Sequence, residues 1–349
     1  MQLENLLEQI RPLDQHAMSQ AQILQNNLIK PAGSLGTLEQ IAIQISGITG
    51  LVKNSVSRKL LMLFGSDHGI YDEGVSSAPQ IFTAKLMRAY ALDKNAAINI
   101  LAQNANSELQ IFDLGVKNLP ENSCTNIISR KFMPNGSNNF AKSRAIPSEI
   151  VHDVIKFGVN LVREAKSQDV KIIGTGEVGM GNTSPAAACI LAATNSRDEN
   201  FIGRGAGLSD EKFALKKSVI LNALKFHEKN LRDPFEIISC VGGLDIAAMT
   251  GVFLGGAIFR IPIVIDGVIS ISAALLASKI ATESVNFMIP SHVSQEPAFK
   301  LAIQNLALKI SPFLNLQMRL GEGSGCAIAF QVIDQALAII NNMQTFQSF

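Results

Sequence analysis

The amino-acid sequence predicts an α/β fold in which a mostly parallel sheet is covered by helices on both faces. Short aliphatic runs alternate with longer segments of helical period along most of the chain. The short runs are mainly apolar and lack a strict alternation of apolar and polar residues, which is typical of strands buried on both faces. Glycine-rich loops follow several of these runs, and ligands of parallel sheets bind beyond the carboxyl ends of the strands.

The predicted strands are short and rich in aliphatic or β-branched residues. They are Leu60–Phe64, Leu109–Leu114, Val170–Ile173, Pro262–Ile265 and Asn286–Ile289. The segments with helical period, which should form the helices, are Ile81–Leu92, Ala96–Ala102, Glu149–Ala165, Pro185–Ala193, Asp210–His227, Asp245–Phe259 and Ser270–Ile280.

Both ends of the chain have helical patterns and no convincing strand. The sequence therefore predicts a small helical lobe from residues 1–55 and 297–349, and a large α/β catalytic domain over residues 56–296. No Pro-rich or Ser-rich linker separates the two parts, so they should be tightly joined. The most irregular segment, residues 117–144, is rich in Asn, Ser and Pro and is expected to be an excursion at the surface.

Composition excludes several classes of function. Hydrophobic residues make up 47% of the 349 residues and charged ones 17%, so much of the chain should be buried, with room for a subunit interface. A net charge of +1 gives no electrostatic case for binding nucleic acid or an anionic membrane, so an anionic ligand must be held by local groups.

Two further features favour a soluble, cytoplasmic protein. The longest apolar stretch, Ile246–Phe259, is too short to span a bilayer, and the first residues lack the basic and apolar regions of a signal peptide. The four cysteines are far apart and have no metal-ligand spacing, which favours reduced thiols.

A carboxylate between glycines is the first candidate for chemistry. Glu322 lies between Gly321 and Gly323, shortly before the apolar run Cys326–Ile340. Glycines clear space around a carboxylate, whereas a helix start selected for stability would avoid them because each costs backbone entropy. The alternative is structural: Ser324 would be the N-cap of a last helix, and Glu322 a solvated acid near its positive end.

The loop after the third predicted strand is a candidate phosphate site. Gly174–Gly179 reads GxGxxG, and a following helix that starts at Pro185, capped by Thr183 or Ser184, would turn free N–H groups toward the loop. A Rossmann-type NAD-dependent oxidoreductase is the alternative. Its fingerprint requires an acid after a second strand, but the acids at that distance lie in a polar run, Thr194–Asn200. A tight turn without ligand is a further alternative.

Glu177 lies inside this loop, where a carboxylate repels phosphate unless it serves another part of the ligand. A ribose hydroxyl, or positive charge developing on a ribose carbon, would account for it. Further along, Gly203–Gly207 precedes a helix with Lys216 and Lys217, either of which could supply positive charge for a phosphate. Paired lysines on a helix are otherwise a solvated face.

The sequence predicts no metal site. Asp67 and His68 follow the first strand, but no second histidine lies at ligand spacing, and His292 is isolated. The two loops that carry these histidines are expected to shape a pocket.

Nine motifs occur in the order expected of one family. They are KPAGSLG, GSDHG, DEGVSSAPQ, GTGEVGMGNTSPAA, GRGAGL, VGGLDIAAMTG, IDG, SHVSQEP and MRLGEGSG, between about residues 30 and 335. By these motifs the chain resembles the nicotinate-nucleotide:dimethylbenzimidazole phosphoribosyltransferase family. The resemblance implies a Rossmann-like parallel sheet, a small helical lobe from both chain ends, a homodimer, and no metal or other cofactor.

The resemblance also implies a reaction between small-molecule substrates. Nicotinate mononucleotide and 5,6-dimethylbenzimidazole would give α-ribazole 5′-phosphate and nicotinate, a step in assembling the lower ligand of cobalamin. Glu322 would be the general base that takes the azole proton, an effect typically of order 10²–10⁴-fold. The residues that it assigns to the ribose phosphate are Glu177, Gly176, Gly179, Asn182 and Lys216.

The base pocket implied by the resemblance is walled by Ser77, Ala78, Gln80 and Leu86. Some members of the family carry serine and glutamine where this chain has Ala78 and Leu86, so adenine or a phenol stays open as the acceptor beside dimethylbenzimidazole. A noncatalytic nucleotide sensor is a third class of function, although a sensor has little use for a poised carboxylate.

Overall fold

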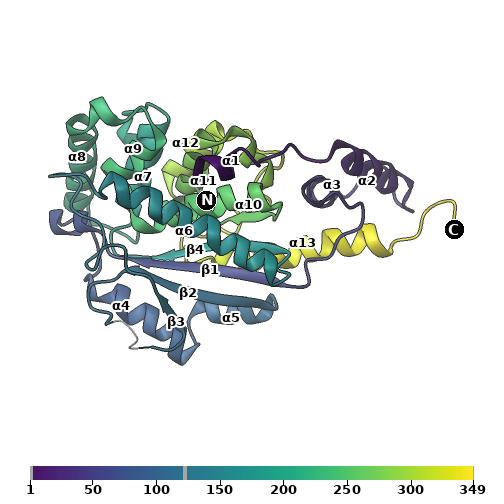
Figure 1. Ribbon diagram of the computed structural model, residues 1–349, viewed down its shortest axis with the longest axis horizontal. Helices are drawn as coiled ribbons and strands as arrows, with labels where there is room; N and C mark the ends of the chain where they lie inside the picture. The colour runs from purple at the N-terminus through teal and green to yellow at the C-terminus, as the bar shows by residue number, and fades with distance from the viewer. Residues whose placement is uncertain (1–2, 121–123, 349) are drawn as a thin grey trace.

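The computed structural model describes residues 3–120 and 124–348 and is built around a six-stranded sheet (Figure 1). The strands are β1 Lys59–Ser66, β2 Ser107–Gly115, β3 Ile127–Ser129, β4 Ile172–Val178, β5 Ile263–Ile265 and β6 Met288–Pro290. Their order is β3-β2-β1-β4-β5-β6, and every pairing is parallel. This is the order of dinucleotide-binding Rossmann domains, so the predicted fold class is confirmed.

Helices cover both faces of the sheet (Figure 1). One layer contains α6 (Ser148–Ser167), α10 (Leu244–Phe259) and α11 (Val268–Ile280). The opposite layer contains α4 (Ile81–Arg88), α5 (Ala97–Asn104) and α13 (Ser324–Asn342).

Side chains of β1 alternate between two cores because successive residues of a strand point to opposite faces. Leu60, Met62 and Phe64 belong to the core under α6 and α10, whereas Leu61 and Leu63 belong to the core under α13. The same alternation divides the neighbouring strands, so each face of the sheet packs against an apolar core.

The remaining helices extend these layers. The set comprises α1 (Leu3–Leu7), α2 (Gln15–Asn27), α3 (Thr37–Thr49), α7 (Thr183–Ala193), α8 (Asp210–Phe226), α9 (Pro234–Val241) and α12 (Pro297–Asn305). At one end of the molecule α2 and α3 pack with α13, while α1 packs on α10 and α12 on α11 (Figure 1). The division into a small lobe and a large domain stays a prediction.

The last helix is long and apolar enough to cross a membrane. More than half of its apolar window is buried inside the protein, where it packs against α3, α5 and β4. These contacts are those of a core helix.

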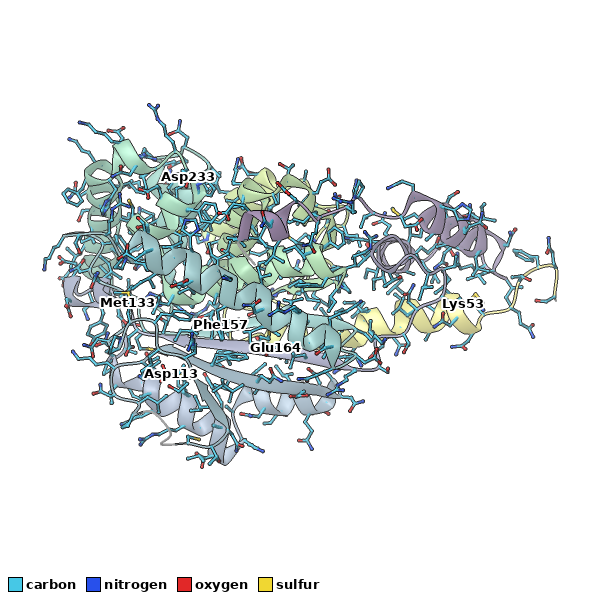
Figure 2. The ribbon with its side chains drawn as sticks, viewed as in Figure 1. Lys53, Asp113, Met133, Phe157, Glu164 and Asp233 are labelled. Atoms are coloured by element: carbon cyan, nitrogen blue, oxygen red, sulfur yellow. The ribbon has the colours of Figure 1, made fainter. Side chains whose placement is uncertain are left out.

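Aromatic packing joins α6 to the sheet. Phe157 of α6 lies edge-on to Phe112 of β2, with ring centroids 6.0 Å apart. Glu164 of the same helix is exposed (Figure 2). The helix therefore has the apolar and polar sides expected of a helix that covers one face of a sheet.

Some local predictions were wrong. The strand predicted to stop at Ile173 continues through Gly174–Val178, which pair with β1. A Cβ at Gly174 would lie 2.7 Å from Cβ of Cys326 on α13, so the glycine lets that helix approach the strand. The helix predicted over Ile81–Leu92 changes to a π-helical turn at Ala89. The helix predicted to start at Pro185 starts at Thr183, with Asn182 as its N-cap.

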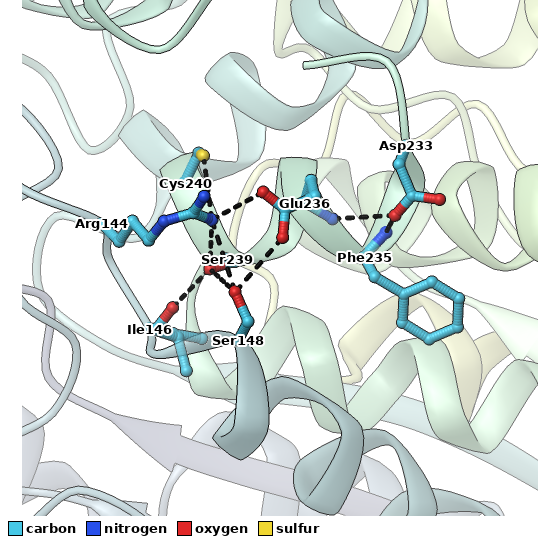
Figure 3. A network of polar contacts seen from close by, with 8 residues as sticks. All are labelled: Arg144, Ile146, Ser148, Asp233, Phe235, Glu236, Ser239 and Cys240. Atoms are coloured by element: carbon cyan, nitrogen blue, oxygen red, sulfur yellow. Dashed lines mark hydrogen bonds and ion pairs between the residues drawn. The ribbon is translucent and has the colours of Figure 1, made fainter. Parts of the chain in front are cut away.

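The irregular segment 117–144 is more than the surface excursion predicted, because it contains β3, which pairs with β2. A polar network holds its end against the helical layer (Figure 3). Arg144 Nη1 lies 2.8 Å from Glu236 Oε2 and donates to Ser239 Oγ at 3.0 Å. Ser148, at the start of α6, donates to the other Glu236 oxygen at 3.2 Å. The network thus joins the start of α6 to α9, which the sequence analysis did not predict.

Candidate active site

A pocket lies beyond the carboxyl ends of the strands, where the sheet order changes direction between β1 and β4. This is the position at which parallel open sheets bind ligands. Its walls come from the segment after β1 (75–78), the end of β4 with its loop (177–183), the turn after β5 (267–269), His292 after β6, and the loop 319–322. Arg204 and Glu296 also line it.

Glu322 lies in this wall on left-handed backbone. Its φ is 62°, between Gly321 at 79° and Gly323 at 85°. A residue other than glycine pays about 1–2 kcal/mol in this conformation, so the surroundings must impose it. A Cβ at Gly321 would lie 2.4 Å from Glu177 Oε1, and one at Gly176 would lie 2.7 Å from the Glu322 carbonyl oxygen. The glycines therefore let the Glu322 backbone lie directly against β4.

Asp266 fixes this loop through hydrogen bonds to its backbone. It is buried after β5, and its carboxylate accepts the N–H groups of Gly323 at 3.0 Å and Gly325 at 2.7 Å. Burial raises the pKa of Asp266, although nearby His292 and the N–H groups oppose the shift. Because Asp266 binds the free N–H groups at the start of α13, it takes the role of a cap.

The structural alternative for Glu322 was therefore wrong. The N-cap of α13 is Gly323, and Ser324 Oγ donates instead to the Gly321 carbonyl at 2.7 Å. Glu322 is half-buried in the pocket wall. Sequence analysis missed Asp266, although the IDG motif at a strand end was the available signal.

Glu177 is the last-but-one residue of β4 and is buried. Its carboxylate binds the Asn182 side-chain amide and accepts the backbone N–H of Glu322. Burial, followed by the charges of Asp245, Asp266 and Glu322, raises its pKa well above the usual 4.5. The Asn182 amide and the Glu322 N–H thus fix a buried carboxyl group in the pocket wall.

The pKa of Glu322 is raised as well. Burial is the main cause and the charge of Asp266 adds to it, whereas the hydroxyl of Tyr90 lowers the pKa. A carboxylate with a raised pKa is a stronger base than a solvated one, which suits proton removal near neutral pH.

Lys216 is fully buried behind the pocket wall. Its Nζ donates to Thr183 Oγ1 at 2.8 Å and to the Gly203 carbonyl at 2.9 Å. Burial lowers its pKa to about 8, with Glu296 opposing the shift. Nζ of the adjacent Lys217 lies 3.2 Å from Glu199 Oε1 and so pairs away from the pocket. Of the two lysines, Lys216 is therefore the one behind the loop.

Two arginines lie at the rim of the pocket. Arg204 pairs with Asp210 at 2.5 Å and lies over the Phe213 ring, and Arg319 Nη1 reaches the Gly205 carbonyl at 3.4 Å. Both line the pocket and are partly open to solvent. Neither arginine was among the site residues predicted from the sequence.

Of the other predicted residues, Ser77, Ala78, Leu86, Gly179 and Asn182 line the pocket. Gln80 precedes α4 as its N-cap residue, and Gly176 lies inside β4 in register with Leu63. The assignment of Gly176 to the phosphate stays a prediction, and its observed role is to receive the Glu322 loop.

The predicted histidine loops both reach this region. His292 lines the pocket, and buried His68 lies 3.4 Å from Asp245 behind Gly179. Over residues 3–120 and 124–348, no group of three or more His, Cys, Asp or Glu side chains could hold a metal ion. The four cysteines are buried and unpaired.

The oxidoreductase alternative is not favoured. Gly174–Val178 forms part of β4, so these residues do not make the tight turn that a dinucleotide fingerprint needs after a strand. The actual loop is shorter and runs from Gly179 to Asn182.

Comparisons with known proteins agree over almost the whole chain. A family model described as phosphoribosyltransferase matches residues 10–348. Nicotinate-nucleotide–dimethylbenzimidazole phosphoribosyltransferases from Clostridium perfringens and Clostridium acetobutylicum are each 42% identical, covering 99% and 100% of this chain and 94% and 97% of their own. The crystal structure of CobT from Thermus thermophilus superposes with a TM-score of 0.89 at 30% identity, covering 95% of this chain and 98% of its own.

Proposed function

Because the chain belongs to the nicotinate-nucleotide–dimethylbenzimidazole phosphoribosyltransferase family, we propose that it transfers phosphoribose from nicotinate mononucleotide to 5,6-dimethylbenzimidazole. The products are α-ribazole 5′-phosphate and nicotinate, and the step belongs to assembly of the cobalamin lower ligand. The observation that supports this best is Glu322, a half-buried carboxylate of raised pKa in the wall of a pocket at the sheet's switch point.

In this proposal Glu322 is the general base. One nitrogen of the benzimidazole forms a bond to C1′ of the ribose, while the bond from C1′ to the pyridinium nitrogen breaks and its electron pair stays with nicotinate. The other azole nitrogen becomes acidic as the ring gains positive charge, and Glu322 takes its proton. Attack opposite the leaving group converts the β configuration to α.

The ribose phosphate is proposed to lie toward the Gly179–Asn182 loop. Lys216 behind that loop supplies buried positive charge, and Arg204 and Arg319 supply exposed charge at the rim. Glu177 is proposed to hold a ribose hydroxyl, because its carboxyl group lines the pocket beside this loop and is fixed by the Asn182 amide. The acceptor ring is assigned to the wall of Ala78 and Leu86, which continues across the pocket with Val268 and Leu320.

The proposal is tested by incubating the protein with nicotinate mononucleotide and a panel of azoles and phenols, and by measuring product masses and released nicotinate. We expect the α-ribazole 5′-phosphate mass with dimethylbenzimidazole. Binding of nicotinate mononucleotide without release of nicotinate, whatever the acceptor, would leave the sensor alternative. Stronger thermal stabilisation by NAD than by nicotinate mononucleotide would instead favour an oxidoreductase.

We further propose that the protein acts as a homodimer, as the family resemblance implies, and that it acts in the cytoplasm, as its dispersed, unpaired cysteines favour. Sedimentation equilibrium across the working concentration range tests the dimer, and a monomer that keeps full activity would contradict it.

A further inference from the structure

The helix that walls the proposed base pocket ends in an irregular turn. After Arg88 the chain continues as a π-helical turn over Ala89–Asp93, closed by the Lys94 N–H on the Ala89 carbonyl at 2.9 Å. Single π-helical turns are rare and occur frequently at functional sites. In this case the turn carries Tyr90, one of two tyrosines in the chain.

Two side-chain amides fix the turn. Asn99 Nδ2 donates to the Tyr90 carbonyl at 2.9 Å, and Asn126 Nδ2 donates to the Ala91 carbonyl at 2.9 Å. Both carbonyls are thereby satisfied outside the helix, so the turn is held by neighbouring elements. The backbone position of Tyr90 is fixed with it.

The Tyr90 hydroxyl lies in the core beside the active site. Tyr90 is 1% exposed and belongs to the same apolar cluster as Leu61 and Cys326. Within the described residues its oxygen makes no hydrogen bond of normal length. A buried hydroxyl without a hydrogen-bond partner lowers the stability of the fold by about 1–3 kcal/mol, which suggests a functional role for this one.

Tyr90 lies one helical turn after Leu86, and Leu86 lines the same pocket as Glu322. Burial and the negative charge of Glu322 raise the pKa of Tyr90, and the Tyr90 hydroxyl in turn lowers the pKa of Glu322. Glu322 is therefore the pocket carboxylate that this hydroxyl influences, and no hydrogen bond joins the two side chains in this structure.

We propose that Tyr90 is a positioning residue for Glu322: when the acceptor base is bound, the Tyr90 O–H forms a hydrogen bond to one carboxylate oxygen and directs the other toward the base. The inference rests on the proposed role of Glu322 as general base. Tyr90 keeps its proton throughout, because Glu322 receives the azole proton on the oxygen that Tyr90 does not bind. The π-helical turn is then part of the active site.

Other ionisable groups also surround Glu322, and any pH effect must be separated from theirs. They are Glu177 from β4, Asp266 after β5, His292 after β6, Arg319 in the same loop, and Arg204 and Glu296 across the pocket. The charge of Asp266 raises the pKa of Glu322, whereas Tyr90 acts in the opposite direction.

The first test is the pH profile of Tyr90→Phe, with Tyr71→Phe as the matched control. We expect kcat to fall roughly tenfold, the size of one hydrogen bond to a charged group. The acidic limb of kcat/KM should move to higher pH, because removal of the hydroxyl raises the pKa of Glu322. Tyr71→Phe should change neither quantity. An unchanged rate, or an equal loss at every pH, would overturn the proposal.

The second test needs no turnover and so separates this inference from the proposed function. Tyrosine labelled with ¹³C at Cζ gives one signal in the Tyr71→Phe protein, because only Tyr90 remains. Its chemical shift should follow the titration of a carboxyl group, and this dependence should disappear in Tyr71→Phe/Glu322→Gln. The same titration curve in both proteins would refute the contact, even if Tyr90→Phe fails to fold.

Discussion

The acidic wall of the pocket and its basic rim are built in opposite ways. On the acidic wall Glu177 and Asp266 are buried at strand ends and hold the Glu322 loop through its backbone N–H groups. On the rim Arg204 and Arg319 extend from loops and stay in contact with solvent. The difference indicates that the wall is built for position and a raised pKa, and the rim for attraction of a charged ligand.

Lys216 belongs to neither pattern. It is a cation, but it is buried and fixed by two hydrogen bonds like the acids of the wall. The comparison therefore predicts graded losses on substitution: greatest on the acidic wall, intermediate for the buried cation, and smallest on the exposed rim.

The largest effect is expected for Glu322→Gln. The amide cannot take the azole proton, so kcat should fall by roughly 10²–10⁴-fold. Affinity for nicotinate mononucleotide, measured by calorimetry, should be retained because the loop geometry is unchanged. Glu211→Gln, an exposed acid on α8, is the control and should behave as the wild type. Turnover near the wild-type rate in Glu322→Gln would end the assignment of the base.

Asp266→Asn should follow. The substituted amide keeps one acceptor oxygen but turns an N–H₂ group toward the N–H of Gly323 or Gly325, so one bond that fixes the loop is lost. We expect kcat to fall about 10–100-fold, the loss of one hydrogen bond to a charged group. KM for nicotinate mononucleotide should change little. If KM rises while kcat holds, Asp266 serves ligand binding instead.

Lys216 gives an intermediate effect with a pH signature. Its pKa is lowered to about 8, so the free enzyme loses this charge as pH rises through 8. The wild-type kcat/KM for nicotinate mononucleotide should therefore decline above that pH. Lys216→Met should be lower by roughly tenfold below pH 8 and lack this decline, since a single ionic hydrogen bond is worth about that much. Lys217→Met is the control, and equal losses in both variants would contradict the role of the buried lysine.

The rim should give the smallest effect. Exposed charges contribute about 0–1 kcal/mol each, so Arg319→Gln should raise KM for nicotinate mononucleotide by no more than about fivefold. The increase should shrink in 0.5 M salt because solvent-exposed charges are screened. A loss as large as that of Asp266→Asn would show that the rim also positions the ligand.

The fold could be predicted from sequence because its strands are mostly buried on both faces and read as short, mainly apolar runs. The end of β4 could not, since Gly174 and Gly176 look like a loop signal. Their lack of side chains serves contacts with α13 and the Glu322 loop, which are far away in sequence. A local pattern cannot distinguish a glycine needed for a turn from one needed for a close approach.

The same limit applies to the site. Glu322 is marked by its flanking glycines, and Lys216 by its place after a glycine-rich segment. Tyr90 carries no local mark and Asp266 only that of the IDG motif, because their roles depend on loops contributed by distant parts of the chain. The π-helical turn at Ala89 is invisible to a helical pattern that allows only 3.6 residues per turn.

The position of Glu322 directly before α13 has a consequence for the fate of truncated chains in the cell. The helix that follows this residue also covers β4 and β5 on one face of the sheet. A chain cut before Ser324 would lose the cover of that face and the structure that holds the loop at the same time. Such a fragment would expose apolar strands and be recognised as misfolded, so it would not persist as a soluble protein that binds substrate without turning it over.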